Sequence, residues 1–241
     1  MSGITVTTLD YAKLSRRSLE YLVTHFRPQG VKTSLGPPRV IRAWFGPGIL
    51  NLDTCMAVYG GFLREGRIEE AAFISPAALS YAHNGTRDAL AALLPAIPTG
   101  SVDAVWAPGG EFARGCIQAL TDAGRHDIKL VSIDVSGEDL RVMTARQDIW
   151  LASAAVDPAF IGIVNMRILA AKLAGEITPA TFYFDAMVLE TEGLNSAVNM
   201  GNLASMIPGW QHTRGLFDDY PWMEELKTAA GKYQRIPAAA E

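Results

Sequence analysis

Cysteine and histidine are scarce in this sequence of 241 residues, which holds two cysteines and four histidines. Cys55 and Cys116 are too few for a disulfide framework and do not match the spacing of a zinc site. The histidines are scattered and show no ligand spacing. We therefore expect neither a metal site nor a cofactor, and we expect Cys116 to be a small buried residue on an apolar helix face.

Long apolar runs and an excess of one charge are also missing. No stretch of eighteen apolar residues is present, which excludes a typical membrane-spanning helix. The net charge is −4, and the charges are mixed along the chain without the basic stripe that nucleic acid requires. Residues 1–6 lack the basic start and apolar run of a secretory signal, so we expect either a cytoplasmic protein or a natural start upstream.

Motifs of catalysis and nucleotide binding are absent as well. The sequence has no Gly-x-Ser-x-Gly elbow, no His-Glu-x-x-His pair, no Gly-x-Gly-x-x-Gly fingerprint and no phosphate loop. Gly46-Pro47-Gly48 lacks the third glycine of a dinucleotide site. Glu111 and Asp134 could be imagined as an acid–base pair, but no spacing supports it. We expect no enzyme activity.

What the sequence does contain is 49% apolar residues in alternating short and long segments. Short apolar runs predict strands at residues 4–8, 40–45, 71–75, 102–107, 128–134, 151–156 and 182–189. Amphipathic stretches between them predict helices at residues 11–26, 53–64, 86–97, 111–123, 138–145 and 159–174, and a last helix begins at Pro221. This alternation predicts an α/β fold, a parallel sheet with helices on both faces.

Ligands of open parallel sheets bind at the carboxyl ends of the strands, so residues that follow the predicted strands are candidates. We predict a ligand site formed by two aromatic and three acidic residues: Trp44, Trp106, Glu111, Asp134 and Asp157. Carboxylates accept hydrogen bonds from hydroxyl groups, and indole rings cover the apolar face of a sugar ring. The mixture favours a polyhydroxylated ligand.

Each candidate also has a structural explanation. Asp157 precedes a proline and a helix, where it would serve as an N-cap. Glu111 would interact favourably with a helix N-terminus, and either tryptophan could belong to the core. Asp134 directly follows an apolar strand and has the least local reason for its position.

The order of several segments over residues 101–176 resembles the type I periplasmic sugar-binding proteins of bacterial ABC importers, in particular the relatives of the ribose receptor. The segments that carry the resemblance are Ser101-Val102-Asp103-Ala104-Val105-Trp106-Ala107, Glu111-Phe112-Ala113-Arg114-Gly115, Gln118 to Arg125, Ile128 to Asp134, and Ala154-Ala155-Val156-Asp157-Pro158 with the helix that follows. A weaker likeness at residues 6–10 matches the crossover into the second lobe.

The resemblance implies a type I periplasmic-binding-protein fold with two α/β lobes, of which this chain contains mainly the second and lacks most of the first. It implies a second-lobe-like domain at residues 1–157, and a returning helix, late strand and tail at residues 158–241. Asp134 matches the family's sugar-binding aspartate and Asp157 its last binding turn. The chain departs from the family in having no arginine near Asp53 and in having Gly109-Gly110 before Glu111.

Three functions remain open. The first is a non-catalytic receptor that delivers a sugar or polyol to the permease of an ABC importer, in the periplasm as the resemblance implies. The second is a truncated relative that no longer binds sugar and forms a homo-oligomer through an exposed apolar face. The third is an enzyme on the same scaffold, since fold does not determine function.

Overall fold

The computed structural model describes residues 4–26, 36–207, 210 and 219–233. Its larger sheet has six strands in the spatial order β3 (Glu69–Ile74), β2 (Arg39–Ala43), β4 (Ala104–Ala107), β5 (Lys129–Ile133), β6 (Trp150–Ala155) and β8 (Met187–Glu190). All neighbouring strands are parallel except β6 and β8. The fold is therefore α/β with a mostly parallel sheet, as the sequence predicted.

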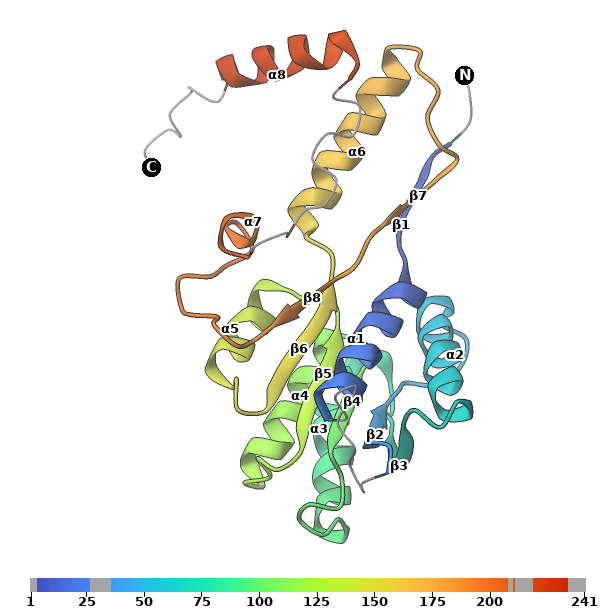
Figure 1. Ribbon diagram of the computed structural model, residues 1–241, viewed down its shortest axis with the longest axis vertical. Coiled ribbons are helices and arrows are strands. Elements are labelled where there is room, and N and C mark those ends of the chain that lie inside the picture. Colours follow the sequence, from blue (N-terminus) through green and yellow to red (C-terminus); the bar gives the residue numbers. More distant parts are fainter. Residues whose placement is uncertain (1–3, 27–35, 208–209, 211–218, 234–241) are drawn as a thin grey trace.

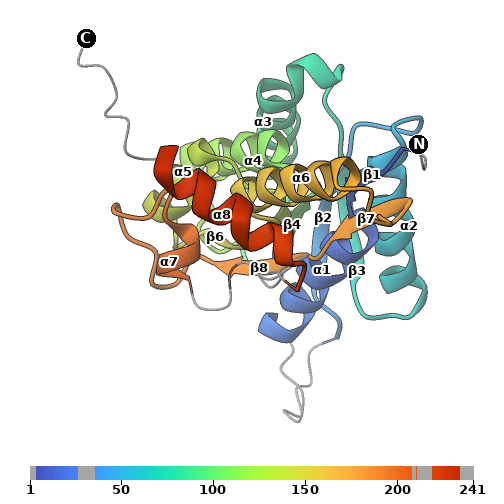
Figure 2. The ribbon, with the colours of Figure 1, turned by 90° about the horizontal axis from the view of Figure 1, so that it is seen from above.

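Helices cover both faces of this sheet, and we call the sheet with these helices the lobe (Figures 1 and 2). The helices are α1 (Tyr11–Phe26), α2 (Leu50–Arg64), α3 (Ala82–Leu93), α4 (Gly110–Asp122) and α5 (Gly137–Ala145), with short 3-10 turns η1 (Leu79–Tyr81) and η2 (Leu94–Ala96). One apolar cluster joins α3, α4 and α5 to the sheet, and a second joins α1 and α2 to its other face. Burial on both faces explains why the strands are almost continuously apolar.

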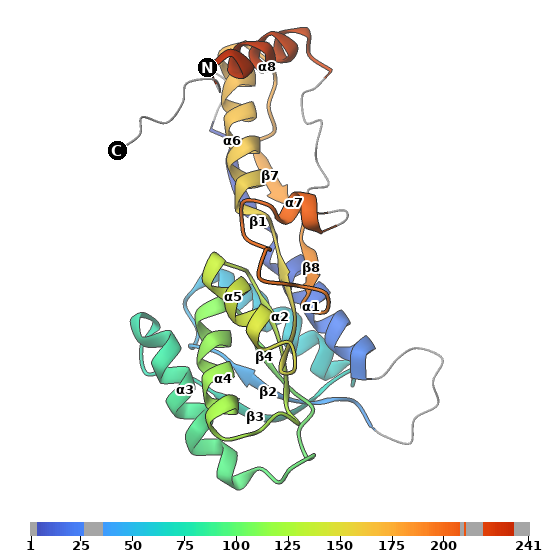
Figure 3. The ribbon, with the colours of Figure 1, turned by 90° about the vertical axis from the view of Figure 1, so that its left-hand side faces the viewer.

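A second part of the molecule projects from the lobe and consists of β1 (Val6–Leu9), β7 (Thr181–Phe184) and α6 (Pro158–Leu173). We call this part the stem. β1 and β7 form a two-stranded parallel sheet, and α6 packs on it through a small cluster that includes Phe160, Val164 and Phe184. Figures 1 and 3 show that β6 leads directly into α6, and that the carboxyl end of β6 lies on the side from which the stem projects.

The remaining described elements are α7 (Leu203–Met206) and α8 (Pro221–Tyr233), and α8 lies near the far end of α6 (Figure 3). The Trp222 indole donates a hydrogen bond to Glu176, at 3.1 Å, just beyond α6. Within the described residues no helix is long and apolar enough to cross a membrane. The same residues contain no group of three or more His, Cys, Asp or Glu side chains that could hold a metal ion.

Three sequence predictions about elements need correction. The late strand at residues 182–189 is two strands, β7 in the stem and β8 in the lobe, because the chain changes sheets at Asp185 and Ala186. The helix expected to begin at Asp53 begins at Leu50, and the Asp53 carboxylate accepts a hydrogen bond from the Gly48 amide at 3.0 Å. The helix expected at residue 86 begins at Ala82. The proposed domain boundary at residue 157 stays a prediction.

Candidate functional site

The candidate site lies along one edge of the six-stranded sheet, where β2, β4, β5 and β6 end, which we call the carboxyl edge. The chain places β2 and β3 on one side of the sheet and then β4, β5 and β6 on the other, so the connections diverge between β2 and β4. Crevices at such topological switch points are the usual ligand sites of open α/β sheets. Trp44 follows β2 and Glu111 opens α4 after β4, so both flank the switch point.

Asp134 follows β5 and is the candidate best placed for a ligand. Its side chain is exposed, and among the described residues it is the only non-glycine residue with a positive φ, at 69°. Aspartate tolerates this left-handed conformation better than most residues, and such outliers cluster at binding sites. One carboxylate oxygen accepts a hydrogen bond from the Val135 amide at 2.9 Å, which leaves further acceptor capacity for a ligand.

Two polar residues that sequence reasoning missed lie near Asp134. Burial, and then the charge of Asp134, raise the pKa of the Tyr11 phenol, and the nearby Asn51 side chain acts in the opposite direction. Tyr11 begins α1 and Asn51 lies in the first turn of α2. The signal for both is weak in the sequence, because polar residues at helix starts are usually explained by local capping.

Trp44 and Glu111 are accessible but have internal contacts. The ring of Trp44 is partly buried, the Arg42 guanidinium lies 5.1 Å from its centroid, and its indole nitrogen has no hydrogen-bond partner in the described residues. The exposed Glu111 carboxylate accepts a hydrogen bond from Arg114. Arg114 also pairs with Asp139 at the start of α5, so it links the two helices beside the carboxyl edge.

Trp106 is placed differently from the sequence expectation. It lies inside β4 rather than after it, and 0% of its surface is exposed. Its indole nitrogen donates to the Ser18 hydroxyl at 2.9 Å, and its ring stacks on Tyr59 with centroids 5.3 Å apart. In this structure Trp106 is a core residue and does not reach the carboxyl edge.

Asp157 is also largely enclosed, with 4% of its surface exposed. Its carboxylate accepts a hydrogen bond from the Ala159 amide at 2.8 Å and caps the N-terminus of α6. The capping role anticipated from the sequence is therefore confirmed. Three of the five candidates stay accessible beside the ends of the neighbouring strands β2, β4 and β5, namely Trp44, Glu111 and Asp134. The other two, Asp157 and Trp106, are buried.

The sequence departs from the receptor pattern at Gly109-Gly110, and the structure gives a physical reason for Gly110. A Cβ atom at position 110 would lie 2.4 Å from a carboxylate oxygen of Asp139, so any other residue would collide with the side chain that Arg114 holds. Asp139 in turn forms a capping box with Ser136 at the start of α5. The glycine lets α4 and α5 approach each other, and it leaves a backbone surface with no side chain beside the switch point.

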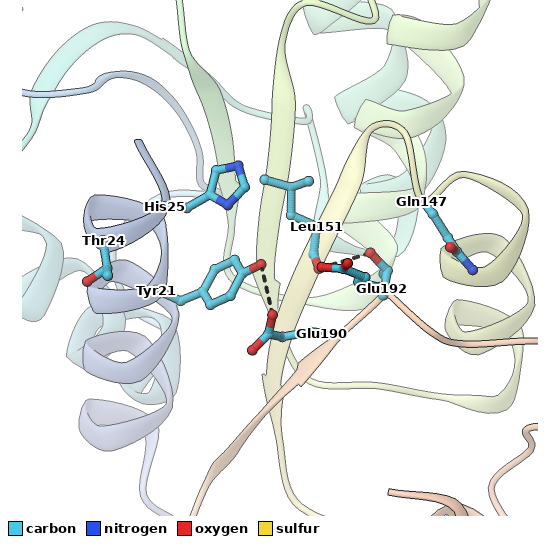
Figure 4. A pocket seen from close by; sticks show the side chains of 8 residues that line it. Tyr21, Thr24, His25, Gln147, Leu151, Glu190 and Glu192 are labelled. Atoms are coloured by element: carbon cyan, nitrogen blue, oxygen red, sulfur yellow. Dashed lines mark hydrogen bonds between the residues drawn. The ribbon is translucent and has the colours of Figure 1, made fainter. Parts of the chain in front are cut away.

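A separate surface pocket of about 490 Å³ lies between α1 and the strands β6 and β8 (Figure 4). Its lining includes Tyr21, Glu190 and Glu192. Burial, and then the charge of Glu190, raise the pKa of Tyr21 to about 12, and the two side chains lie 3.5 Å apart. None of the sequence-predicted site residues lines this pocket.

Comparison with solved structures identifies the class of protein. The chain superposes on a sugar ABC transporter protein from Yersinia enterocolitica with a TM-score of 0.76 and 35% identity, over 95% of this chain and 66% of the other. It superposes on the 5-methylthioribose transporter solute-binding protein from Thermotoga lettingae with a TM-score of 0.73 and 24% identity, over 92% of this chain and 66% of the other.

A third match is the binding-protein component of the arabinose ABC transporter from Shewanella, with a TM-score of 0.63 and 18% identity, over 78% of this chain and 59% of the other. No protein-family model and no curated protein matches the chain. The matches confirm the predicted resemblance: the chain is related to the type I periplasmic sugar-binding proteins of bacterial ABC importers. It spans about two thirds of the length of the first two of these structures.

Proposed function

We propose that this chain is a receptor component of an ABC importer that binds a sugar or polyol at the carboxyl edge and releases it chemically unchanged. The observation that carries the proposal is the 35% identity, over 95% of the chain, with a sugar ABC transporter protein. Solved structures of the same fold hold 5-methylthioribose and arabinofuranose. Their ligands are polyhydroxylated, which agrees with the polar residues exposed around Asp134.

Asp134 is the proposed anchor for the ligand. Its carboxylate can accept charge-assisted hydrogen bonds from two hydroxyl groups of a sugar. We expect the Tyr11 phenol, whose pKa burial and the charge of Asp134 raise, and its neighbour Asn51 to add further donors and acceptors. Trp44 and Glu111 would complete the polar and aromatic lining at the switch point, while Asp157 and Trp106 would support the site from within the fold.

Two further parts of the proposal concern partner and location. A receptor of this kind would hand its ligand to the permease of the importer, and it would act in the periplasm. Both follow from the resemblance to the importer receptors and depend on the same sugar-binding role. A purified permease complex that binds the sugar-loaded chain would support them.

Isothermal titration calorimetry of the full chain with ribose, arabinose, allose, 5-methylthioribose and xylitol tests the binding proposal. We expect heat of binding with at least one of them, and a loss of affinity of about tenfold or more for Asp134→Asn, because a hydrogen bond to a charged group contributes about 1.5–3 kcal/mol. Asn tolerates the same backbone conformation. Asp148→Asn, at the opposite edge of the sheet, is the matched control and should bind like the wild type. Equal affinity for Asp134→Asn and the wild type would contradict the site.

A second candidate function is self-association, and one observation favours it. The outward face of α6 exposes Ile163, Met166, Leu169 and Leu173, with exposed fractions of 46%, 64%, 49% and 82%. A contiguous apolar face of this kind is typical of an interface. Size-exclusion chromatography with light scattering would show a concentration-dependent mass for the wild type and a monomer for Met166→Glu/Leu169→Glu. A monomeric wild type at all concentrations would contradict this candidate.

A further inference from the structure

A buried chain of hydrogen bonds runs through the lobe toward the candidate site. The Trp150 indole donates to the Ser132 hydroxyl at 3.1 Å, Ser132 donates to the Ser153 hydroxyl at 2.9 Å, and Ser153 donates to the Asp134 carbonyl at 2.7 Å. Trp150, Ser132 and Ser153 are each 0% exposed. A hydroxyl group in the interior of a doubly covered sheet destabilises the fold unless it is hydrogen-bonded. The presence of two such serines, with all their hydrogen bonds formed, therefore calls for an explanation.

The local register of the sheet makes this chain possible. β5 and β6 pair Leu130 with Trp150 but Val131 with Ala152, so β6 holds one extra residue, Leu151, at this point. Side chains alternate between the faces of a strand, and an extra residue reverses the alternation. The shift therefore brings Trp150 onto the same face as the paired residues Ser132 and Ser153.

The chain ends on the one described non-glycine residue with a left-handed backbone. The Asp134 amide donates to the Ala154 carbonyl at 2.8 Å, and its own carbonyl accepts from Ser153. Both polar groups of the Asp134 backbone are thus bound to β6. A left-handed conformation in a non-glycine residue persists only where the surroundings hold it in place. The direction in which the Asp134 carboxylate leaves the sheet depends on that conformation.

We propose that Ser153 is a positioning residue for ligand binding: it holds the backbone of Asp134 in the left-handed conformation that presents the carboxylate to the ligand. The proposal rests on the sugar-binding function proposed above. Ser132 and Trp150 orient the Ser153 hydroxyl. Trp150 donates to Ser132 and Ser132 donates to Ser153, so the Ser153 oxygen is the acceptor of that bond and its own proton is available to the Asp134 carbonyl. Ser153 contacts no ligand itself and acts through Asp134.

The two serines provide a matched pair of variants. Ser153→Ala and Ser132→Ala each remove one buried hydroxyl and two hydrogen bonds of the chain, but only Ser153→Ala removes the bond to Asp134. We expect similar losses of stability in urea unfolding for both. We expect Ser153→Ala alone to raise the dissociation constant for the sugar, by about five- to tenfold, the effect of one neutral hydrogen bond. Equal affinity losses in the two variants would overturn the proposal.

A double variant separates positioning from a general weakening of the lobe. If Ser153 acts through the Asp134 carboxylate, Ser153→Ala should have little further effect on affinity in an Asp134→Asn background. A full five- to tenfold effect in that background would overturn the proposal. If Ser153→Ala does not fold, the isosteric pair Ser153→Thr and Ser153→Val makes the same comparison, with Thr retaining the hydroxyl and the affinity.

Hydrogen exchange tests the positioning without any ligand. The Val135 amide donates to the Asp134 carboxylate, so its protection reports the conformation of this turn. Measured by NMR at one pH, its exchange should accelerate at least about fivefold in Ser153→Ala and stay within twofold of the wild type in Ser132→Ala. This result, together with no sugar binding by the wild type, would reject the proposed function and retain the positioning role. Equal exchange in both variants would overturn the positioning role itself.

Discussion

In the lobe, the strands β2, β4, β5 and β6 lie between helices on both sides of the sheet, whereas in the stem the two-stranded sheet has one helix on one side (Figures 1 and 3). The stem is apolar as well: α6 exposes Ile163, Met166 and Leu173 on the face opposite to its buried residues Val164 and Ile168. A parallel sheet normally has both faces covered. Whether an apolar helix or strand is buried therefore depends on the elements that pack against it, and its apolar content alone does not decide this.

The largest expected difference between the two parts concerns their aromatic side chains. Trp106→Ala should lower the free energy of unfolding by about 3–5 kcal/mol, because it leaves a large cavity in the lobe. Phe160→Ala should cost less than half as much, because the stem cluster is small and few buried side chains surround Phe160. Urea unfolding followed by circular dichroism measures both. Equal losses would mean that the stem and the lobe unfold as one equally packed unit.

Two helical glycines give the next contrast. A Cβ atom at Gly115 would lie 2.3 Å from the His83 carbonyl oxygen of α3, so Gly115→Ala should destabilise the lobe by about 1–3 kcal/mol. A Cβ atom at Gly162 of α6 meets nothing within 4 Å. Gly162→Ala should therefore stabilise the protein by about 0.5–1 kcal/mol, through the higher helix propensity of alanine.

Thermal unfolding of these two glycine variants checks the signs. A melting temperature that falls for Gly115→Ala and rises for Gly162→Ala would agree with a packed lobe and an open outer face on α6. A fall for both variants would mean that the outer face of α6 is already covered in solution.

A smaller effect is expected from pH at the opposite edge of the lobe. The hydrogen bonds from Arg125 are the main cause that lowers the pKa of Asp127 to about 2. The unfolded chain has a pKa near 3.9 for aspartate, so this stabilisation is complete above about pH 4 and is lost as the pH falls through about 2. Asp127 is partly exposed, so its pair contributes about 1 kcal/mol or less.

Urea midpoints of the wild type and Asp127→Asn between pH 5 and pH 2 measure this contribution. The two proteins should differ most at pH 5 and converge toward pH 2. A difference that is constant over this range would contradict the assignment to the ionised carboxylate.

The sequence predicted the lobe better than the site. Alternating apolar segments and the Asp157 cap fix β4 to α6 within a few residues, because local patterns and capping decide them. In strands buried on both faces, however, the pattern of apolar residues does not show which face a side chain occupies, so the sequence left the core position of Trp106 as one of two alternatives. The extra residue at Leu151, the left-handed turn at Asp134 and the approach of Tyr11 and Asn51 arise from tertiary pairing, for which the sequence has no local signal.

The most direct test of the account is thermal unfolding of the wild type and Asp134→Asn with and without a panel of pentoses, hexoses and polyols. A ligand at a thousand times its dissociation constant stabilises a protein by about 4 kcal/mol, which for a chain of this size raises the melting temperature by roughly 8–16 °C. We predict such a rise for at least one sugar with the wild type and a much smaller one with Asp134→Asn. A wild type that unfolds cooperatively, with an unchanged melting temperature across the whole panel, would contradict sugar binding at the carboxyl edge.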